Sequence, residues 1–185
     1  MSRVSKMTIG ALATGLCLGA VAAPAQAKSE HITGGHATVR AETAISSFLI
    51  SRGITVTAVG SAHIGGGAMT MPMVGGTVTT PTMAGTMDAT GGLQYKKGNK
   101  VVRVSSYILT HKNGKAKLTA LVNGHRITIA TMSAPKVHMT QTKGTMSGDL
   151  EISGQWAKLI NHLVGLHVVH AGETIGQLSM TIKMS

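Results

Sequence analysis

The stretch that decides the fold is residues 113–124, which read Asn-Gly-Lys-Ala-Lys-Leu-Thr-Ala-Leu-Val-Asn-Gly. Each Asn-Gly pair supplies two residues that tolerate positive φ, as the tight turn of a β-hairpin requires. Between the two turns, alanine, leucine and valine at alternate positions are interleaved with lysine and threonine. This alternation is typical of a strand with one buried and one exposed face. Residues 115–122 are therefore predicted to be the middle strand of a meander.

The neighbouring segments extend this meander in both directions. Residues 101–109 precede the first turn, residues 125–131 follow the second, and Gly98-Asn99 connects an earlier strand at 93–96. Glycine, threonine and β-branched residues dominate much of the chain, and turn residues recur about every ten positions. We expect an all-β fold, an antiparallel sandwich or barrel-like meander with two short accessory helices.

The two helices are predicted where the apolar period changes. Residues 43–52 place Ile45, Phe48 and Leu49 on one helical face, and residues 155–164 place Trp156, Leu159, Ile160 and Leu163 on one face. A glycine follows each segment and can end the helix in a left-handed conformation. We expect each helix to cover a different end of the sheet system.

The two helical segments also look like copies of each other. Gly53-Ile54-Thr55-Val56 after the first helix corresponds in spacing to Gly165-Leu166-His167-Val168 after the second. This likeness predicts a strand–helix–strand unit that is used twice.

The first 27 residues have the pattern of a secretory signal peptide. Arg3 and Lys6 give a positive start, residues 9–23 carry no charge, and Ala25-Gln26-Ala27 fits the small-x-small cleavage rule. The apolar run is too short to span a bilayer. We expect cleavage near Ala27, followed by secretion or association with the cell wall.

After the signal peptide we expect a flexible N-terminal stretch at residues 28–36 and a single β-rich domain at residues 37–185. The only cysteine is Cys17, within the signal peptide, so the remaining chain has no disulfides. No later segment is apolar and long enough to span a membrane.

The charge of the chain is strongly basic, with 17 Lys and Arg against six Asp and Glu. Anionic cell-wall polymers are therefore candidate partners. Nucleic acid is not expected, because one Phe, one Trp and two Tyr provide too few stacking platforms. The sequence has no Gly-x-Ser-x-Gly elbow, no His-Glu-x-x-His motif and no phosphate loop, so no enzymatic activity is expected.

Most of the chain after Gly53 resembles a group of exported, β-rich actinobacterial proteins. The residues that carry the resemblance are 73–78 (Met-Val-Gly-Gly-Thr-Val), 84–93 (Ala-Gly-Thr-Met-Asp-Ala-Thr-Gly-Gly-Leu), 156–161 (Trp-Ala-Lys-Leu-Ile-Asn), Gly165 and 171–176 (Ala-Gly-Glu-Thr-Ile-Gly). The group is similar to the HtaA-type domains of corynebacterial haem uptake, and Ser47-Phe48 matches a Ser-Phe segment of those domains.

The resemblance implies a cell-envelope β domain that binds haem, with a tyrosine as the iron ligand. The family tyrosine falls a few residues after Ser-Phe, where this chain has Ser51. Tyr95 and Tyr107 are the two tyrosines that could replace it.

Methionines provide an alternative site. In Met69-Thr70-Met71-Pro72-Met73, strand alternation would place three thioethers on one face, and His63 lies upstream. Soft sulfur ligands suit Cu(I). Methionine also replaces aliphatic residues on inward faces.

Three hypotheses for the function follow from these features. The first is an exported, non-catalytic cell-envelope module that binds haem or another small ligand. The second is a Met- and His-rich copper carrier. The third is a basic structural or adhesive cell-wall protein.

Overall fold

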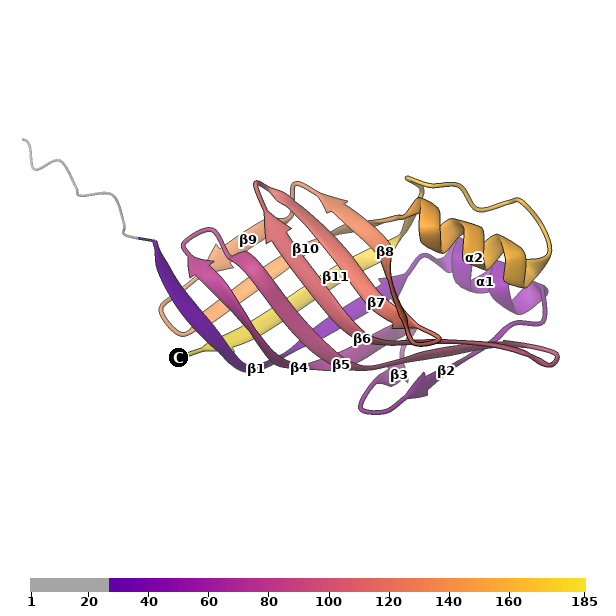
Figure 1. Cartoon of the computed structure of the whole chain (residues 1–185), viewed down its shortest axis with the longest axis horizontal. Coiled ribbons are helices and arrows are strands. Elements are labelled where there is room, and N and C mark those ends of the chain that lie inside the picture. Colours follow the sequence, from indigo (N-terminus) through magenta and orange to yellow (C-terminus); the bar gives the residue numbers. More distant parts are fainter. Residues whose placement is uncertain (1–26) are drawn as a thin grey trace, which may run out of the picture.

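A closed barrel of antiparallel strands forms the body of the protein in the computed structural model, which describes residues 27–185 (Figure 1). Its strands are β1 (Lys28–Ala41), β4 (Ala68–Thr80), β5 (Ala84–Lys97), β6 (Lys100–Lys112), β7 (Lys115–Val122), β8 (His125–Ser133), β10 (Lys143–Ile152) and β11 (Thr174–Met184). They follow the order β5–β6–β7–β8–β10–β11–β1–β4, and β4 pairs with β5 to close the ring. The predicted all-β, barrel-like fold is confirmed.

Shorter elements attach to this ring. The strands β2 (Thr55–Val59), β3 (His63–Gly65) and β9 (Lys136–Met139) pair with β5, β4 and β10, and the helices are α1 (Thr43–Ser51) and α2 (Gly154–Val164). The expected signal peptide lies outside the described residues, except for Ala27.

The strands β6, β7 and β8 form the predicted meander. Asn113 and Asn123 have φ of 52° and 48°, and the glycine after each also has positive φ. The strand pairs close at Lys112–Lys115 and at Val122–His125, so each loop has two residues. Two successive positive φ values in a two-residue loop are what a hairpin of type I′ needs.

The expectation of a flexible stretch at residues 28–36 is wrong, because these residues belong to β1. Lys28 pairs with Thr80 of β4, and His36 pairs with both Pro72 of β4 and Thr181 of β11. Gly35 is a close-packed position in this strand, since a Cβ there would lie 2.1 Å from the carbonyl oxygen of Thr181. The barrel therefore begins at Lys28.

The seam between β4 and β5 closes the barrel over only part of their length. The pairing extends from Thr79–Ala84 to Met73–Ala89 and includes a register shift between Met73 and Gly75. A Cβ on Gly76 would lie 2.2 Å from the carbonyl oxygen of Thr86, so the close approach of the strands requires glycine there. Beyond this seam β4 pairs with β3, and β5 pairs with β2. The two strands therefore part at one end of the barrel.

Both helices lie at this open end and line one cavity there (Figure 1). The expectation that they cover opposite ends is wrong, for a reason that follows from the topology. The strands β1 and β10 both run antiparallel to β11, so they point in the same direction. The helix that follows each of them must emerge at the same end of the barrel.

The helix ends agree with the sequence prediction. The hydroxyl of Ser153 accepts a hydrogen bond from the backbone N–H of Trp156 at 3.0 Å, which caps the start of α2. Gly53 and Gly165 follow the helices with φ of 68° and 79°, in the left-handed region.

The predicted second copy of the strand–helix–strand unit is incomplete. The strand β2 follows α1 directly, whereas the next strand after α2 begins only at Thr174. The Asn161 side chain holds the intervening loop, since its oxygen accepts from the N–H groups of Val168 and Val169. These bonds replace the strand pairing that the sequence likeness predicts.

Methionine dominates the barrel interior. The largest fully buried side chains include those of Met71, Met83, Met87, Met132, Met146 and Met180. Flexible thioether side chains fill irregular space between strands. Within residues 27–185, neither helix has the length and hydropathy to cross a membrane.

Replacement of Trp156 by alanine should lower the free energy of unfolding by about 3–5 kcal/mol, because the indole is 5 % exposed and supports the packing of α2. The matched control is Val74→Ala, at a side chain that is 60 % exposed, for which we expect a change of at most about 0.5 kcal/mol. Denaturant titrations of both variants measure the difference. A loss below about 1 kcal/mol for Trp156→Ala would contradict the placement of this side chain.

Candidate functional site

A cavity of about 590 Å³ lies between the two helices and the open end of the barrel. We call it the end pocket. Its volume is within the range of about 300–1,000 Å³ that is typical of small-molecule sites. Both helices, β2 and the ends of the barrel strands contribute to its lining, which includes Ile45, Phe48 and Leu49 of α1, Val56 of β2, Trp156 and Ile160 of α2, and Met69, Leu93, Tyr95 and Tyr107 of the barrel.

All four aromatic residues of the chain line this pocket. The sequence contains one Phe, one Trp and two Tyr, which are Phe48, Trp156, Tyr95 and Tyr107. They come from α1, α2, β5 and β6, so the fold gathers residues that are scattered along the chain. Aromatic side chains present large flat surfaces to a ligand. Their concentration makes the end pocket the principal candidate for a binding site.

The lining of the end pocket is mostly apolar. The residues that line it include no Asp, Glu, His, Lys, Arg or Cys. Its polar side-chain groups are the Trp156 indole and the hydroxyls of Ser46, Thr55 and the two tyrosines. The lining therefore lacks a carboxylate or imidazole base and a thiol nucleophile.

The tyrosines differ in depth. Half-buried Tyr95 meets Trp156 edge-on, with 5.6 Å between the ring centroids, and burial raises the pKa of Tyr95 to about 12. Tyr107 is 5 % exposed, and burial, then the negative charge of ionised Tyr95, raises the pKa of Tyr107 above its ordinary value. Within residues 27–185, neither hydroxyl makes a hydrogen bond to another side chain or to the backbone. Both phenols are neutral at neutral pH, and their oxygens are available to a ligand.

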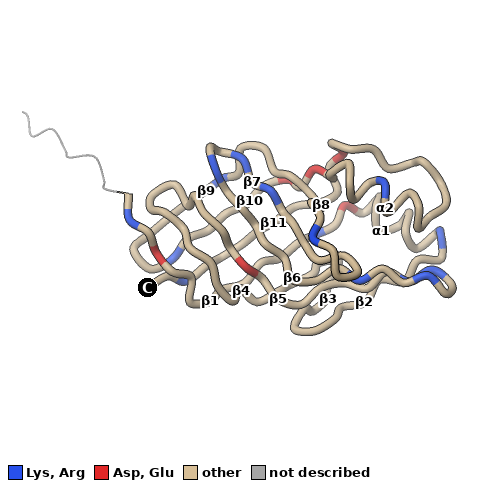
Figure 2. Tube along the Cα trace, viewed as in Figure 1, with Lys and Arg blue, Asp and Glu red and all other residues tan. Residues whose placement is uncertain are grey.

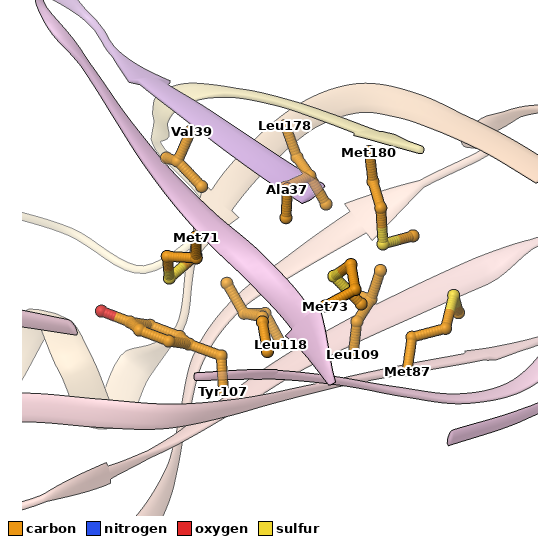
Figure 3. A pocket seen from close by; sticks show the side chains of 11 residues that line it. Ala37, Val39, Met71, Met73, Met87, Tyr107, Leu109, Leu118, Leu178 and Met180 are labelled. Atoms are coloured by element: carbon orange, nitrogen blue, oxygen red, sulfur yellow. The ribbon is translucent and has the colours of Figure 1, made fainter. Parts of the chain in front are cut away.

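Tyr107 also separates the end pocket from a smaller cavity of about 20 Å³ inside the barrel. Val39, Tyr107 and Leu118 line both cavities and form the wall between them. In Figure 3 the hydroxyl of Tyr107 points away from the part of the small cavity that is lined by Met73, Met87 and Met180.

The three methionines of the predicted copper site lie on one face of β4, directed into the barrel, as alternation predicts. Met69 lines the end pocket, while Met71 and Met73 line the small cavity. His63 is exposed on β3 and pairs with Thr70, whose position on β4 alternates with those of the methionines. The structure therefore places the three thioethers on one face of β4 but divides them between two cavities, with His63 exposed on the neighbouring strand, and copper binding stays a prediction.

Ser51 ends α1 on the outside of the pocket. Its hydroxyl donates a hydrogen bond to the carbonyl oxygen of Phe48 at 2.8 Å, and the residue is exposed. Phe48 itself lines the pocket. The resemblance implies a tyrosine at the position of Ser51. The hydroxyl of Ser51 instead donates a hydrogen bond to the backbone of its own helix.

Sequence reasoning assigned the apolar faces of both helices to the core and missed their role in the pocket. The helical period indicated that Ile45, Phe48, Trp156 and Ile160 face inward, but it could not indicate a space between them and the barrel. Both helices share one end because β1 and β10 run in the same direction beside β11, and this long-range pairing has no local signal in the sequence.

Structures of known proteins share this architecture. The C-terminal domain of HtaA from Corynebacterium glutamicum superposes with a TM-score of 0.73 at 10 % identity, covering 84 % of this chain and 99 % of that domain. This chain has the HtaA-domain fold. The N-terminal domain of HtaA gives 0.64 at 13 % identity, covering 82 % of this chain and 97 % of that domain. The haem-binding protein HtaB from the same organism gives 0.63 at 10 % identity, covering 86 % and 98 %.

The similarity to these proteins is one of structure, and the sequence identity is low. No protein-family model matches it, and a comparison with curated proteins finds no match. The resemblance to HtaA-type domains is thus confirmed as a distant one, at the level of the HtaA-like fold.

The raised pKa values of both tyrosines predict their behaviour in alkali. An ultraviolet titration of tyrosinate should show no ionisation step near pH 10, and the first step should appear near pH 12. Between these values the unfolded chain releases protons that the folded state keeps, so the free energy of unfolding should fall as the pH rises from about 10 to about 12. Below pH 10 these groups should have no effect. A full-amplitude step near pH 10 in the folded protein would contradict the raised pKa values of the two tyrosines.

Proposed function

We propose that this protein is a non-catalytic, exported module that binds haem in the end pocket. The observation that carries the proposal is the gathering of every aromatic side chain of the chain around one apolar cavity that contains two phenol groups. The HtaA-like fold supports it, since HtaB, which has this fold, is a haem-binding protein.

The residues of the pocket fit a haem in size and chemistry. A porphyrin is a large, flat and mostly apolar molecule, and the end pocket is large, lined by aliphatic side chains and flanked by four aromatic rings. Tyrosine oxygen is one of the ligands that proteins use for haem iron, so a phenol of this pocket would hold a bound haem through its iron.

Tyr107 and Tyr95 are the two tyrosines of the pocket that could hold the iron. Tyr107 comes from the centre of a barrel strand and is buried, so its ring is fixed by surrounding core side chains. Tyr95 lies near the end of β5 and packs against Trp156. The residues that line the pocket include no His or Cys, and its other candidate donors are the thioether of Met69 and the hydroxyls of Ser46 and Thr55.

Titration of the protein with hemin should give a saturable, one-to-one shift of the Soret band. Tyr107→Phe and Tyr95→Phe remove one oxygen each and keep the ring, and the variant that loses the iron ligand should lose the charge-transfer features of a tyrosinate complex. Retention of the same spectrum by both variants and by the double variant would contradict ligation by these tyrosines.

Occupation of the pocket is tested by a matched pair of substitutions in the same titration. Val56→Trp places a large ring where a half-buried valine lines the pocket, so it should weaken hemin binding by at least about tenfold. Val74→Trp makes the same change at an exposed position outside the pocket lining and should leave binding unchanged. Equal affinity in the two variants would place any bound hemin elsewhere.

Export forms the second part of the proposal, and the composition of residues 1–27 supports it. The strand β1 begins at Lys28, so cleavage after Ala27 would leave the whole barrel intact. Location at the cell envelope would bring the module to haem outside the cell. The basic charge of the chain would favour contact with anionic wall polymers.

Intact-mass analysis of the protein expressed in an actinobacterial host should give a chain that begins at Lys28 in the extracellular or wall fraction. Ala25→Leu and Ala27→Leu place bulky residues where the cleavage rule demands small ones, and should leave the precursor uncleaved. Recovery of the full-length chain in the cytosol would contradict export. Retention on wall material without hemin binding would support the adhesive alternative instead.

A further inference from the structure

Exposed apolar side chains gather at the end of the barrel that carries the helices. Among the described residues, the large hydrophobic side chains with high exposure are Ile50, Ile64, Val74, Val101, Leu166 and Val168. Ile50 is 73 % exposed, and both it and Ile64 also line the end pocket, so they form its rim. Val101 follows the β5–β6 turn, and Leu166 and Val168 follow α2. Only Val74 of this set lies elsewhere, within β4.

A hydrogen bond connects the β5–β6 turn to α2, and the end pocket is lined by both helices. The ammonium group of Lys97, next to the β5–β6 turn, donates to the carbonyl oxygen of Val164 at the end of α2, at 2.6 Å. The helices α1 and α2 both line the end pocket. We use the name helix-end surface for the exposed residues Ile50, Arg52, Lys96, Lys100, Val101 and Leu166.

The segments that form the helix-end surface carry only positive charges, while Glu42, Glu151 and Glu173 lie outside these segments at the same end of the barrel. Residues 45–57, 93–104 and 159–170 contain Arg52, Lys96, Lys97, Lys100 and Arg103, and no Asp or Glu. Figure 2 shows the β5–β6 turn and the end of α1 marked as basic, with no acidic residue on either segment. Near an anionic lipid surface, each such cation strengthens binding by about fivefold.

The combination of cations with exposed apolar side chains distinguishes this surface from others on the molecule. Lys112, Lys115 and Lys117 also form a basic group, around the β6–β7 turn, but none of the large exposed apolar side chains belongs to that segment. A polyanionic polymer needs only charge. At a membrane, apolar side chains enter the boundary between headgroups and acyl chains while the cations stay at the headgroups.

We propose that the helix-end surface docks on an anionic lipid surface, with the mouth of the end pocket facing the membrane. Docking in this orientation gives an apolar ligand a path between bilayer and pocket that avoids water. The proposal goes beyond haem binding and does not depend on it, because the surface and its charges are present in the protein without a ligand.

The test is co-sedimentation of residues 28–185, which contain every described strand and helix, with vesicles of phosphatidylcholine alone or mixed with phosphatidylglycerol. The protein should bind the mixed vesicles and bind those of phosphatidylcholine much more weakly. Lys96→Gln with Lys100→Gln should reduce the partition coefficient by about thirtyfold. Ile50→Ser should reduce it by about tenfold, because the side chain loses its burial in the bilayer boundary.

The matched controls make the same changes away from the surface. Lys112→Gln with Lys115→Gln, and Val74→Ser, should leave partition within about twofold of the parent. Equal losses in the two lysine pairs, or no effect of Ile50→Ser, would show unspecific attraction of a basic protein to polyanions and overturn the proposal. Absence of binding to the mixed vesicles would overturn it directly. Hemin titration of the parent and of the two lysine pairs, none of which lines the end pocket, reports on that pocket separately, so failure of one proposal is distinguishable from failure of the other.

Discussion

The partial seam between β4 and β5 is the constraint on which the rest of the structure depends. Glycines at positions 76 and 85 let the two backbones approach, since a Cβ on either would lie within 2.2 Å of a carbonyl oxygen of the opposite strand. Where the pairing stops, β4 turns to β3 and β5 to β2, and the barrel opens. Closure at one end and opening at the other therefore have one origin, the length over which these two strands can pair.

Strand direction converts this opening into a pocket. The strands β1 and β10 run in the same direction on either side of β11. The helices that follow them, α1 and α2, therefore both lie over the open end. Their apolar faces, which in a smaller opening would complete the core, instead border a cavity of about 590 Å³. The HtaA-like fold thus provides a binding space from elements that individually resemble ordinary core elements.

Much of the fold could be predicted from local sequence, because Asn-Gly turns and alternating residues act over short distances. The meander around residues 115–122, both helices and the inward methionines of β4 are examples. What local pattern could not supply was long-range arrangement. Residues 28–36 were expected to be flexible, but Gly35 within them packs closely against β11, and the outward position of His63 depends on its pairing with β4. The resemblance to HtaA-type domains implied a tyrosine ligand and so pointed to Tyr95 and Tyr107, whereas their shared pocket depends on two strands and two helices that close around them.

The gathering of the aromatic residues has an optical consequence. Trp156 is the only tryptophan of the chain, and it lies in edge-on contact with one of the two tyrosines at the wall of the pocket. Almost all of the intrinsic fluorescence of the protein therefore originates at one place. A molecule that enters the end pocket, coloured or colourless, would change the polarity around this indole or quench it by energy transfer. The fluorescence of Trp156 would therefore report whether the end pocket is occupied, without an added label.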